Sequence, residues 1–398
     1  MKKKIAILGS TGSIGKTTID IIKKDIHNFD VILLTSNNNY RDLAKQAKEL
    51  NVKNLIINNR KHYLNLKKKL KNKKINIYNN FLNLNKIFNK KIDYTMCAIS
   101  GLQGLSPTLD MIKFTKNVAI ANKESLICGW NLIKKKLIKY NTQFIPVDSE
   151  HFSIWSLIKN VKKSEIEEII ITASGGPFLK LPISKFNKIK PSSAVKHPNW
   201  LMGKKISIDS ATMMNKVFEV IEAQRIFDIE LEKFKILVHP HSYVHSIVKF
   251  NNGTTKILVH DTNMKIPIFN TLYSNNSKKL NSKKLDIKKL NNLNFTNVDK
   301  KKFPIINILN YVSKKFSFYE TVIVSSNDLL VELFLEGKIK FLDISKYLNI
   351  VAKLKEFEKF KRILPKNINQ IIKLSKYVRL KTQSLSVISQ NSWKFFIS

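Results

Sequence analysis

The chain has 398 residues, of which 43% are hydrophobic, and a formal net charge of +41. A chain of this length exceeds one ordinary core and predicts a soluble globular protein of two or three domains. The charge does not indicate nucleic-acid binding, because the lysines are spread along the chain and the guanidinium groups that nucleic-acid readers favour are few. The arginines are Arg41, Arg60, Arg225, Arg362 and Arg379.

Membrane and secretory signals are also weak. A membrane span needs about eighteen consecutive apolar residues, and no such run occurs. The apolar run Ile5–Leu8 after the first lysines is too short for a signal peptide. Cys97 and Cys128 form no CxxC pair and lie in apolar surroundings, so we expect buried, reduced thiols and a cytoplasmic protein.

Residues 1–147 alternate short apolar runs with amphipathic stretches, which is the pattern of βαβ units around a parallel sheet. Lys16–Lys24 and Tyr40–Leu50 are among the expected helices. The expected strands are Ile5–Leu8, Val31–Thr35, Leu55–Ile57, Ile75–Tyr78, Tyr94–Ala98, Val118–Ala121 and Gln143–Pro146.

Three further segments follow. Residues 148–273 contain mixed strands and predict an α+β catalytic domain with one open sheet, residues 274–300 are polar and predict a linker, and residues 301–398 predict a helical domain. Helical periodicity in the last segment covers Ile305–Phe316 and Ser326–Glu336. The expected strands of the catalytic domain are Glu167–Thr172, Lys235–Val238, Ser246–Phe250 and Thr255–His260.

A glycine-rich turn follows the first expected strand and precedes a helix. Glycines at such a turn let the backbone approach a pyrophosphate, and the helix N-terminus supplies oriented N–H groups. A tight turn with no ligand is the alternative. The context predicts a Rossmann-type dinucleotide site, formed by Gly9, Ser10, Thr11, Gly12, Ser13, Ile14 and Gly15.

The end of the second strand indicates which dinucleotide binds. Asn37, Asn38 and Asn39 stand there, followed by Arg41, and no carboxylate is present to repel a 2′-phosphate. NADPH is therefore the expected cofactor, although Arg41 is equally consistent with an ordinary helix cation. Two later strand ends are expected near the nicotinamide, because ligands of open α/β sheets lie outside the carboxyl ends of the strands. These ends carry Ala98, Ile99, Asn122, Lys123 and Glu124, where Lys123 either meets substrate or pairs with Glu124.

Three acidic residues indicate a metal site. Asp148 and Glu150 follow a strand, and in extended chain alternate side chains share a face, so both are expected to converge on one Mg²⁺ or Mn²⁺. Glu219 lies three residues after Lys216 on a helix expected to begin near Ala211, which places both on one face. The alternatives are a common surface DxE pair and an ordinary ion pair on a solvated helix.

Hydroxyl, amide and ammonium groups gather in the same region. Ser210, Thr212, Asn215 and Lys216 are suited to a phosphate dianion, and the turn Ser174–Pro177 offers further donors.

A tryptophan and several histidines are expected near the same pocket. Trp200 follows His197 in a segment with no core periodicity, which predicts a lid over a ligand, with a core anchor as the alternative. His239, His241 and His245 are interpreted as walls of the pocket or as hydrogen-bonded core histidines, since no cysteine accompanies them.

Taken together, these motifs closely resemble the 1-deoxy-D-xylulose 5-phosphate reductoisomerase family over nearly the whole chain. Where that family usually carries Gly-Lys-Asn after the second strand, this chain has Asn37 to Asn39, and His241 stands at a common Gln position. The matching runs are Gly9–Gly15, Ala121–Ser125, Pro146–His151, Ser174–Phe178, His197–Gly203, Lys205–Glu219, His239–Ser246, Met264–Pro267 and Ser326–Asp328.

The resemblance implies a homodimeric enzyme that uses NADPH and a divalent metal to convert 1-deoxy-D-xylulose 5-phosphate to 2-C-methyl-D-erythritol 4-phosphate in isoprenoid synthesis. It implies Asp148, Glu150 and Glu219 as metal ligands, and a mobile flap with Trp200 and Met202. Catalytic roles are expected for Lys123 and the three acids, and a cofactor contact for Gly203. The substrate site implied by the resemblance comprises Ser149, Glu150, Ser174, His197, Trp200, Met202, Ser210, Asn215, Lys216, Glu219 and Ser242.

Two other functions fit the residues less well. Another NADPH-dependent oxidoreductase acting on a phosphorylated or carboxylated substrate would not need the three carboxylates. A basic nucleic-acid-binding protein would need clustered arginines and aromatic platforms. We therefore expect a small sugar phosphate as partner, with neither nucleic acid nor membrane.

Overall fold

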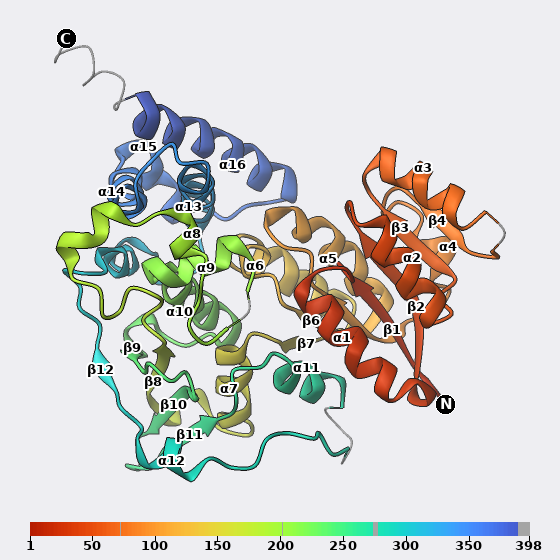
Figure 1. The fold of residues 1–398 in the computed structure, drawn as a ribbon, viewed down its shortest axis with the longest axis horizontal. Coiled ribbons are helices and arrows are strands. Elements are labelled where there is room, and N and C mark those ends of the chain that lie inside the picture. Colours follow the sequence, from red (N-terminus) through yellow and green to blue (C-terminus); the bar gives the residue numbers. More distant parts are fainter. Residues whose placement is uncertain (72, 201, 274–277, 389–398) are drawn as a thin grey trace. The chain divides into compact units, whose positions relative to one another are not determined.

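The computed structural model describes residues 1–71, 73–200, 202–273 and 278–388, which form two compact units (Figure 1). Three stretches with sequence-based expectations lie outside the described residues. They are Leu201, residues 274–277 of the expected linker, and residues 389–398 of the expected helical domain. The first unit comprises Met1–Leu126, Leu132–Phe152 and Asn263–Ser282. The second comprises Ile127–Asn131, Ser153–Thr262 and Lys283–Ser398.

A seven-stranded parallel sheet forms the centre of the first unit, with the order β4-β3-β2-β1-β5-β6-β7. The apolar runs predicted the strands because a parallel sheet covered by helices is buried on both faces. Its strands are β1 (Lys3–Leu8), β2 (Phe29–Ser36), β3 (Asn54–Ile57), β4 (Asn76–Tyr78), β5 (Ile92–Cys97), β6 (Thr115–Ile120) and β7 (Gln143–Pro146). The expected strands are thus confirmed, with ends that differ by up to three residues.

The strand order reverses at β1, whose neighbours are β2 on one side and β5 on the other. Such a switch point opens a crevice at the carboxyl ends of the strands, where dinucleotides bind in sheets of this kind. The helices of this unit are α1 (Ser13–Lys24), α2 (Tyr40–Glu49), α3 (Arg60–Lys69), α4 (Leu84–Ile87), α5 (Leu105–Met111), α6 (Lys123–Lys139) and α11 (Lys265–Leu272), with 3₁₀ turns at Ile26–Asn28, Leu102–Gly104 and Ile112–Phe114.

Helix α11 is distant in sequence but packs into the first unit. Ile268 and Leu272 belong to the same buried cluster as Ile5 and Ile19. The Tyr94 hydroxyl also lies 2.8 Å from Thr271 Oγ1. The chain therefore returns to the first unit after passing through the second one.

The second unit contains a mixed sheet with the order β11-β10-β8-β9-β12, in which only the pair β8 and β9 is parallel among the described strands. Its strands are β8 (Ile166–Ala173), β9 (Phe234–Val238), β10 (Val244–Phe250), β11 (Thr255–Val259) and β12 (Thr296–Asn297). Strand β12 lies within the segment expected to be a linker, and so does α12 (Ile287–Asn291). Part of this polar segment thus extends the sheet, because β12 pairs with β9.

The helices of the second unit begin with α7 (Ser149–Leu157), which starts at the border of the two units. Ile154 of α7 shares a buried cluster with Val220 and Ala223 of α10, so the two helices pack together. The others are α8 (Pro191–Ala194), α9 (Lys204–Thr212), α10 (Met214–Phe227), α13 (Tyr319–Leu335), α14 (Phe341–Ala352), α15 (Lys355–Glu358) and α16 (Ile368–Gln383), with a π-helical turn at Ser384–Ile388. The 3₁₀ turns are Lys163–Glu165, Ile183–Lys188, Leu231–Lys233, η7 (Pro304–Tyr311) and Lys359–Arg362.

The helix expected at 326–336 is part of α13, which already begins at Tyr319, and two other expected helices differ more strongly from the structure. The periodic run 305–316 forms the 3₁₀ helix η7, which ends at Tyr311. Beyond its end, the carbonyls of Ser313 and Lys314 accept hydrogen bonds from Arg225 and Gln224 of α10. The helix expected to begin near Ala211 is two helices, because Met213 has a φ of 71° and separates α9 from α10.

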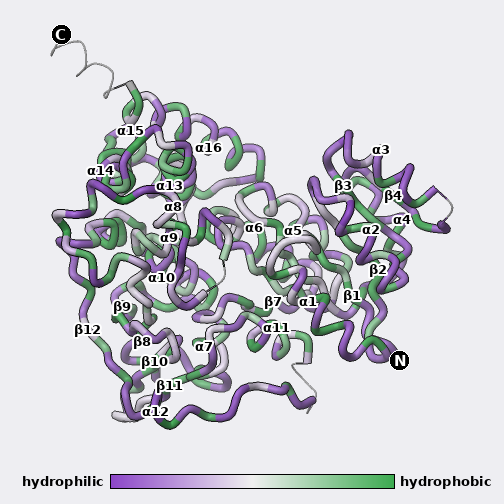
Figure 2. The backbone as a smooth tube through the Cα atoms, viewed as in Figure 1, coloured by the Kyte–Doolittle hydropathy of each residue, from purple (hydrophilic) through white to green (hydrophobic). Residues whose placement is uncertain are grey.

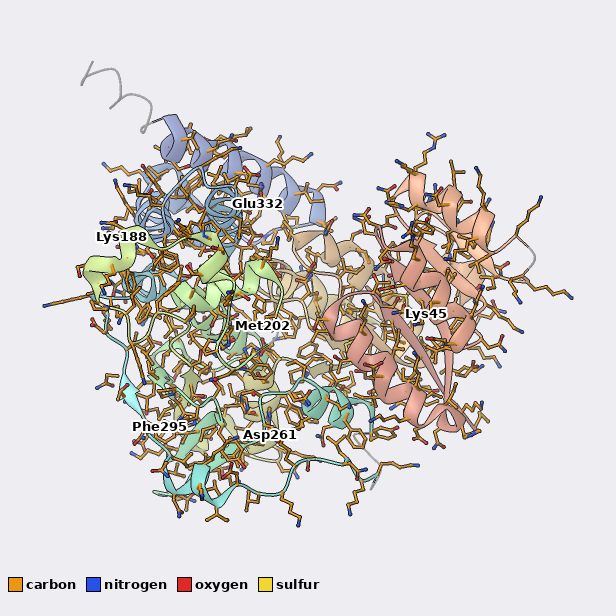
Figure 3. The ribbon with its side chains drawn as sticks, viewed as in Figure 1. Lys45, Lys188, Met202, Asp261, Phe295 and Glu332 are labelled. Atoms are coloured by element: carbon orange, nitrogen blue, oxygen red, sulfur yellow. The ribbon has the colours of Figure 1, made fainter. Side chains whose placement is uncertain are left out.

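Charged residues cover the surfaces of both units. The tube of α3 is largely hydrophilic in Figure 2, and Lys45 and Lys188, labelled in Figure 3, are exposed. Within the part of the chain that the structure describes, none of the helices combines the length and apolarity needed to cross a bilayer.

Candidate active site

The glycine-rich turn after β1 is shaped by close backbone contacts. Gly9 has a φ of 78°, and a Cβ there would lie 2.7 Å from the carbonyl oxygen of Ala98 at the end of β5. A Cβ on Gly15 would lie 2.4 Å from the carbonyl oxygen of Gly9. Gly12, which precedes α1, has no side chain to cap the first N–H groups of that helix. The turn therefore has the backbone geometry of an anion site at a helix N-terminus.

Some residues expected to contact the cofactor are used inside the protein. The buried Ser10 hydroxyl lies 2.7 Å from Gln46 Oε1, and Gln46 Nε2 donates to the Ser10 carbonyl at 3.0 Å. Asn37, Asn38 and Asn39 are all exposed, and Asn39 also caps α2 by accepting from the backbone N–H of Asp42 at 3.1 Å.

At the ends of β5 and β6, too, some of the expected cofactor contacts bond within the protein and others are partly exposed. Asn122 caps α6 by accepting from the N–H of Ser125 at 2.8 Å, and its amide donates to the carbonyl of Gly101 at 2.6 Å. Ala98 and Ile99 at the end of β5 are partly exposed. Lys123 forms an ion pair with Asp148, a partner that differs from the expected substrate or Glu124.

The acid pair after β7 is not in extended chain, so the expected strand-like arrangement of these residues was wrong. Helix α7 begins at Ser149, which places Glu150 in its first turn and Asp148 just before it. The Ser149 hydroxyl donates to Glu150, and both side chains are buried. A carboxylate in the first turn is favourable at a helix N-terminus because of the exposed N–H groups there.

Helix α10 presents a polar face within a buried environment. Glu219 is only 1% exposed, and its Oε2 lies 2.5 Å from Lys216 Nζ, while Asn215 donates to its other oxygen. Val217 and Phe218 of the same helix are also buried. The ion pair, which was the alternative to a metal-ligand role for Glu219, is present, but it is buried and does not lie on a solvated surface.

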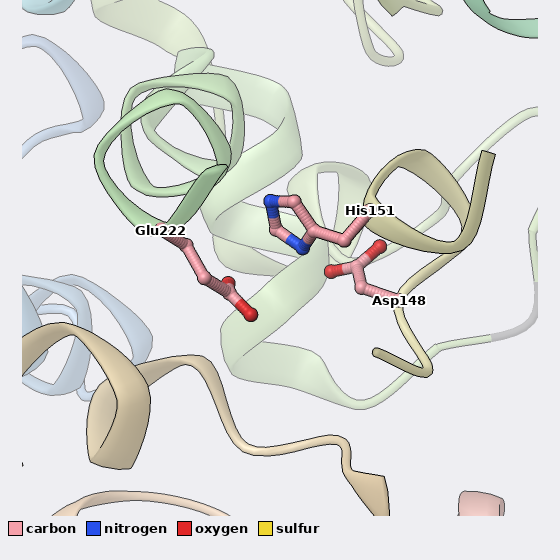
Figure 4. A group of neighbouring side chains, drawn as sticks. All are labelled: Asp148, His151 and Glu222. Carbon is pink, nitrogen blue, oxygen red and sulfur yellow. The ribbon is translucent and has the colours of Figure 1, made fainter. Parts of the chain in front are cut away.

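Two groups of side chains have metal-ligand character. In the first, ligand atoms of Asp148, Glu150 and Glu219 all lie within 4.8 Å of one another. In the second, the same holds for Asp148, His151 and Glu222, which are drawn in Figure 4. Carboxylate oxygens are the ligands that Mg²⁺ and Mn²⁺ prefer, so the first group fits a hard divalent cation.

His151 and Glu222 were not among the expected site residues. His151 is fully buried and Glu222 is 2% exposed. The spacing could have indicated both, since His151 follows Asp148 by three residues and Glu222 follows Glu219 by three on the same face of α10.

A further group of polar residues lies where β8 ends. The Ser174 hydroxyl lies 3.0 Å from His197 Nε2 and accepts from the N–H of Gly176 at 3.1 Å. Gly176 has a φ of 69°, and a Cβ there would lie 2.8 Å from the carbonyl oxygen of Ser210 on α9. The structure thus brings Ser174 next to His197, and the neighbouring Gly176 next to the backbone of Ser210.

The aromatic and histidine residues nearby have defined places. The Trp200 ring lies edge-on to His245, with centroids 6.0 Å apart, and Met202 is partly buried before Gly203, which precedes α9. His239 and His245 are buried and bond to the carbonyls of Asn294 and His260 at 3.0 and 3.1 Å. Burial lowers the pKa of His239, and the bond to Asn294 only partly offsets this. These two are hydrogen-bonded core histidines, whereas His241 is exposed.

Comparison with known proteins identifies the family. A family model described as 1-deoxy-D-xylulose 5-phosphate reductoisomerase matches residues 5–129, and two models of C-terminal domains of that enzyme match residues 144–227 and 260–381. The 1-deoxy-D-xylulose 5-phosphate reductoisomerase of Pelagibacter ubique is 61% identical over 387 residues, which are 97% of this chain and 100% of that protein. The chain belongs to the 1-deoxy-D-xylulose 5-phosphate reductoisomerase family.

Solved structures of reductoisomerases agree with the fold. The reductoisomerase from Zymomonas mobilis in complex with NADPH is 35% identical, with a TM-score of 0.88 over 97% of this chain and 99% of that one. A reductoisomerase in complex with NADPH, fosmidomycin and magnesium is 30% identical, with a TM-score of 0.89 over 96% of this chain and 98% of that one. The expected fold class, with a Rossmann-type sheet, an α+β part and a helical carboxy-terminal part, is thereby confirmed.

Proposed function

We propose that Asp148, Glu150 and Glu219 hold the divalent cation of a reductoisomerase, and that the neighbouring donors bind the phosphate of its substrate. The observation that carries this proposal is the gathering of three carboxylate ligand atoms within 4.8 Å of one another. The donors are Ser174, Ser210, Asn215 and Lys216, and His197 belongs to the same site through its contact with Ser174.

As a member of this family, the chain is an enzyme that converts 1-deoxy-D-xylulose 5-phosphate to 2-C-methyl-D-erythritol 4-phosphate, with NADPH and a divalent metal, in isoprenoid synthesis. A divalent cation held by Asp148, Glu150 and Glu219 would supply Lewis-acid polarisation of the substrate's carbonyl and hydroxyl oxygens. NADPH bound at the turn Gly9–Gly15 would supply the hydride for the reduction.

Two lysines balance part of the negative charge of the three acids. Lys123 pairs with Asp148, and Lys216 with Glu219, so an ammonium group lies beside each of these acids and offsets its negative charge. An ionised carboxylate is the form that binds a metal. Lys216 is thus placed to compensate the acids and to attract a phosphate dianion.

Phosphate binding remote from the reacting carbons orients the substrate, and this binding energy can be used in the transition state. Trp200 and Met202 are proposed to cover the bound substrate and exclude water, with Ser149 and Ser242 as further substrate contacts. The proposal is supported by the partly exposed position of the Trp200 and Met202 segment ahead of α9.

The turn Gly9–Gly15 is proposed to hold the pyrophosphate of NADPH, with Ala98, Ile99 and Gly203 as further contacts. The residues Asn37 and Asn38 are exposed after β2 and are proposed to face the 2′-phosphate. Ser10, Asn39 and Asn122 support the site by fixing its turns.

We further propose a homodimer in the cytoplasm that binds a small sugar phosphate. The reduced state of the buried Cys97 and Cys128 supports a reducing compartment. The division into domains at 1–147, 148–273, 274–300 and 301–398 also stays a proposal.

The test is NADPH oxidation with purified protein and 1-deoxy-D-xylulose 5-phosphate, in chelator-treated buffer and after addition of Mg²⁺ or Mn²⁺. We expect turnover only with metal. Metal-independent turnover would exclude the role given to the three carboxylates, and would favour another kind of NADPH-dependent oxidoreductase.

A further inference from the structure

His197 is held in one protonation state by its own chain neighbours. The backbone N–H groups of Asn199 and Trp200 lie 3.1 and 3.0 Å from His197 Nδ1. A backbone N–H can only donate, so Nδ1 must accept and carries no proton. This arrangement excludes the imidazolium ion and the tautomer protonated at Nδ1.

The remaining proton of the neutral ring is therefore on Nε2, which lies 3.0 Å from the Ser174 hydroxyl oxygen. The Nε2–H group donates to Ser174 Oγ, and the N–H of Gly176 donates to the same oxygen at 3.1 Å. A hydroxyl oxygen accepts two hydrogen bonds, so both acceptor positions of Ser174 are used. The hydroxyl proton of Ser174 is then directed to a third group, which must be an acceptor.

The segment that fixes this tautomer is itself anchored by one side chain. Asn199 Nδ2 lies 2.7 Å from the carbonyl oxygen of Pro240 and 2.9 Å from the hydroxyl oxygen of Ser242. Ser242 lies in a turn with a φ of 51°, and its N–H donates to the carbonyl of His239 at 2.9 Å. The turn 239–242 thus holds Asn199, whose backbone holds His197.

We propose that Asn199 is a positioning residue: it locks His197 as the Nε2–H tautomer and thereby makes the Ser174 hydroxyl a committed donor to the substrate's phosphate. This inference rests on the proposed function, which places Ser174 and His197 in the phosphate site. It also implies that His197 contributes no positive charge there, so that among these groups Lys216 is the cation that meets the phosphate. The pocket then selects anions that accept hydrogen bonds and rejects groups that need an acceptor.

The test is nitrogen NMR of selectively labelled histidine, which distinguishes the two tautomers and the imidazolium ion. The His197 signals are assigned by their loss in His197→Gln. Four forms of the full chain are compared at neutral pH: the natural protein, Asn199→Ala, the isosteric Asn199→Asp, and Asn252→Ala. Asn252 lies in the exposed hairpin between β10 and β11, where it accepts from the N–H of Thr254, and it serves as the matched control.

We expect His197 to be the Nε2–H tautomer in the natural protein and in Asn252→Ala, and a mixture of tautomers in both Asn199 variants. Titration with inorganic phosphate, followed through the same signals, should show about tenfold weaker binding in the Asn199 variants, since a hydrogen bond to a charged group is worth roughly this factor. Asn199→Asp is not expected to restore the Nε2–H tautomer, because aspartate has no N–H group that can donate to the carbonyl of Pro240.

A natural protein protonated at Nδ1, or on both nitrogens, would overturn the proposal. So would an unchanged tautomer in both Asn199 variants, or a changed tautomer with unchanged phosphate affinity. The measurement needs no turnover, NADPH or metal. Failure of the enzyme to convert 1-deoxy-D-xylulose 5-phosphate would therefore refute the proposed function without being mistaken for failure of this inference.

Discussion

The buried ion pair between α10 and α13 provides a sharp test of how the proposed catalytic helix is held. Arg225 Nη2 lies 2.5 Å from Glu320 Oε1, with 4% of the arginine side chain and none of the glutamate side chain exposed. Glu320 also accepts from the hydroxyl and the N–H of Ser317 at 2.7 and 3.2 Å, and Arg225 donates to the carbonyl of Ser313 at 3.1 Å. The substitution Arg225→Met removes the charge and keeps most of the volume.

This substitution leaves Glu320 as a buried carboxylate without its counter-charge, which costs about 3–5 kcal/mol. A unit of this size loses roughly 2–4 °C of Tm per kcal/mol, so Tm should fall by about 6–20 °C. The double variant Arg225→Met with Glu320→Gln keeps an acceptor for Ser317 and has no buried charge. We expect it to cost only about 1–2 kcal/mol, the value of one or two lost hydrogen bonds.

The pH dependence gives an independent check. Burial raises the pKa of Glu320, and Arg225 partly offsets this, so removing Arg225 should raise it further. The folded variant then binds a proton more tightly than the unfolded chain, and its stability falls as pH rises from the ordinary glutamate range towards the raised pKa. Calorimetry between pH 5 and 8 should show a steeper loss for Arg225→Met than for the double variant. Equal stability and equal pH slopes of the two variants would refute the reasoning.

The other predictions concern the proposed site directly. Glu219→Gln should lose most of the NADPH oxidation rate while the far-UV circular dichroism stays unchanged, and an unaltered rate would remove Glu219 from the metal site. Lys216→Ala should mainly raise the KM for 1-deoxy-D-xylulose 5-phosphate, and an unchanged KM would contradict its phosphate role. Gly176→Ala should destabilise the protein by about 1 kcal/mol or more beyond Gly253→Ala, because both require a positive φ but only at Gly176 would a Cβ meet backbone atoms. Equal denaturation midpoints for the two alanine variants would show that the close contact with Ser210 has no energetic weight.

Much of the first unit could be predicted from local pattern alone. Strands buried on both faces appear as short apolar runs, and a glycine-rich turn between a strand and a helix is typical of a dinucleotide site. The common face of Lys216 and Glu219 on α10 could also be predicted locally, because side chains three residues apart in a helix are neighbours. The contact of Gly176 with the α9 backbone was not predicted, because it joins segments more than thirty residues apart and depends on a single positive φ.

The start of α7 shows a second limit. Asp148 and Glu150 follow an apolar strand, and the residues themselves do not reveal that the helix begins between them. The prediction that both acids gather with Glu219 still agrees with the structure, although a helix start and not an extended chain brings them there. A helix start and an alternating strand can each present two acids to one side, so the pattern alone does not separate them.

The polar residues around the turn Gly9–Gly15 show why a sequence pattern predicts more ligand-contacting side chains than the structure leaves available. Ser10, Asn39 and Asn122 stand where ligand contacts are expected, yet their side chains bond to Gln46, Asp42 and Ser125. A turn that approaches a ligand must first satisfy its own backbone, and small polar side chains do this best. The same residue types are therefore required at these places both to contact a ligand and to bond to the protein's own backbone. The role of each side chain as donor or acceptor separates the two purposes. At His197 this role follows from the backbone, because the N–H groups of Asn199 and Trp200 both donate to Nδ1.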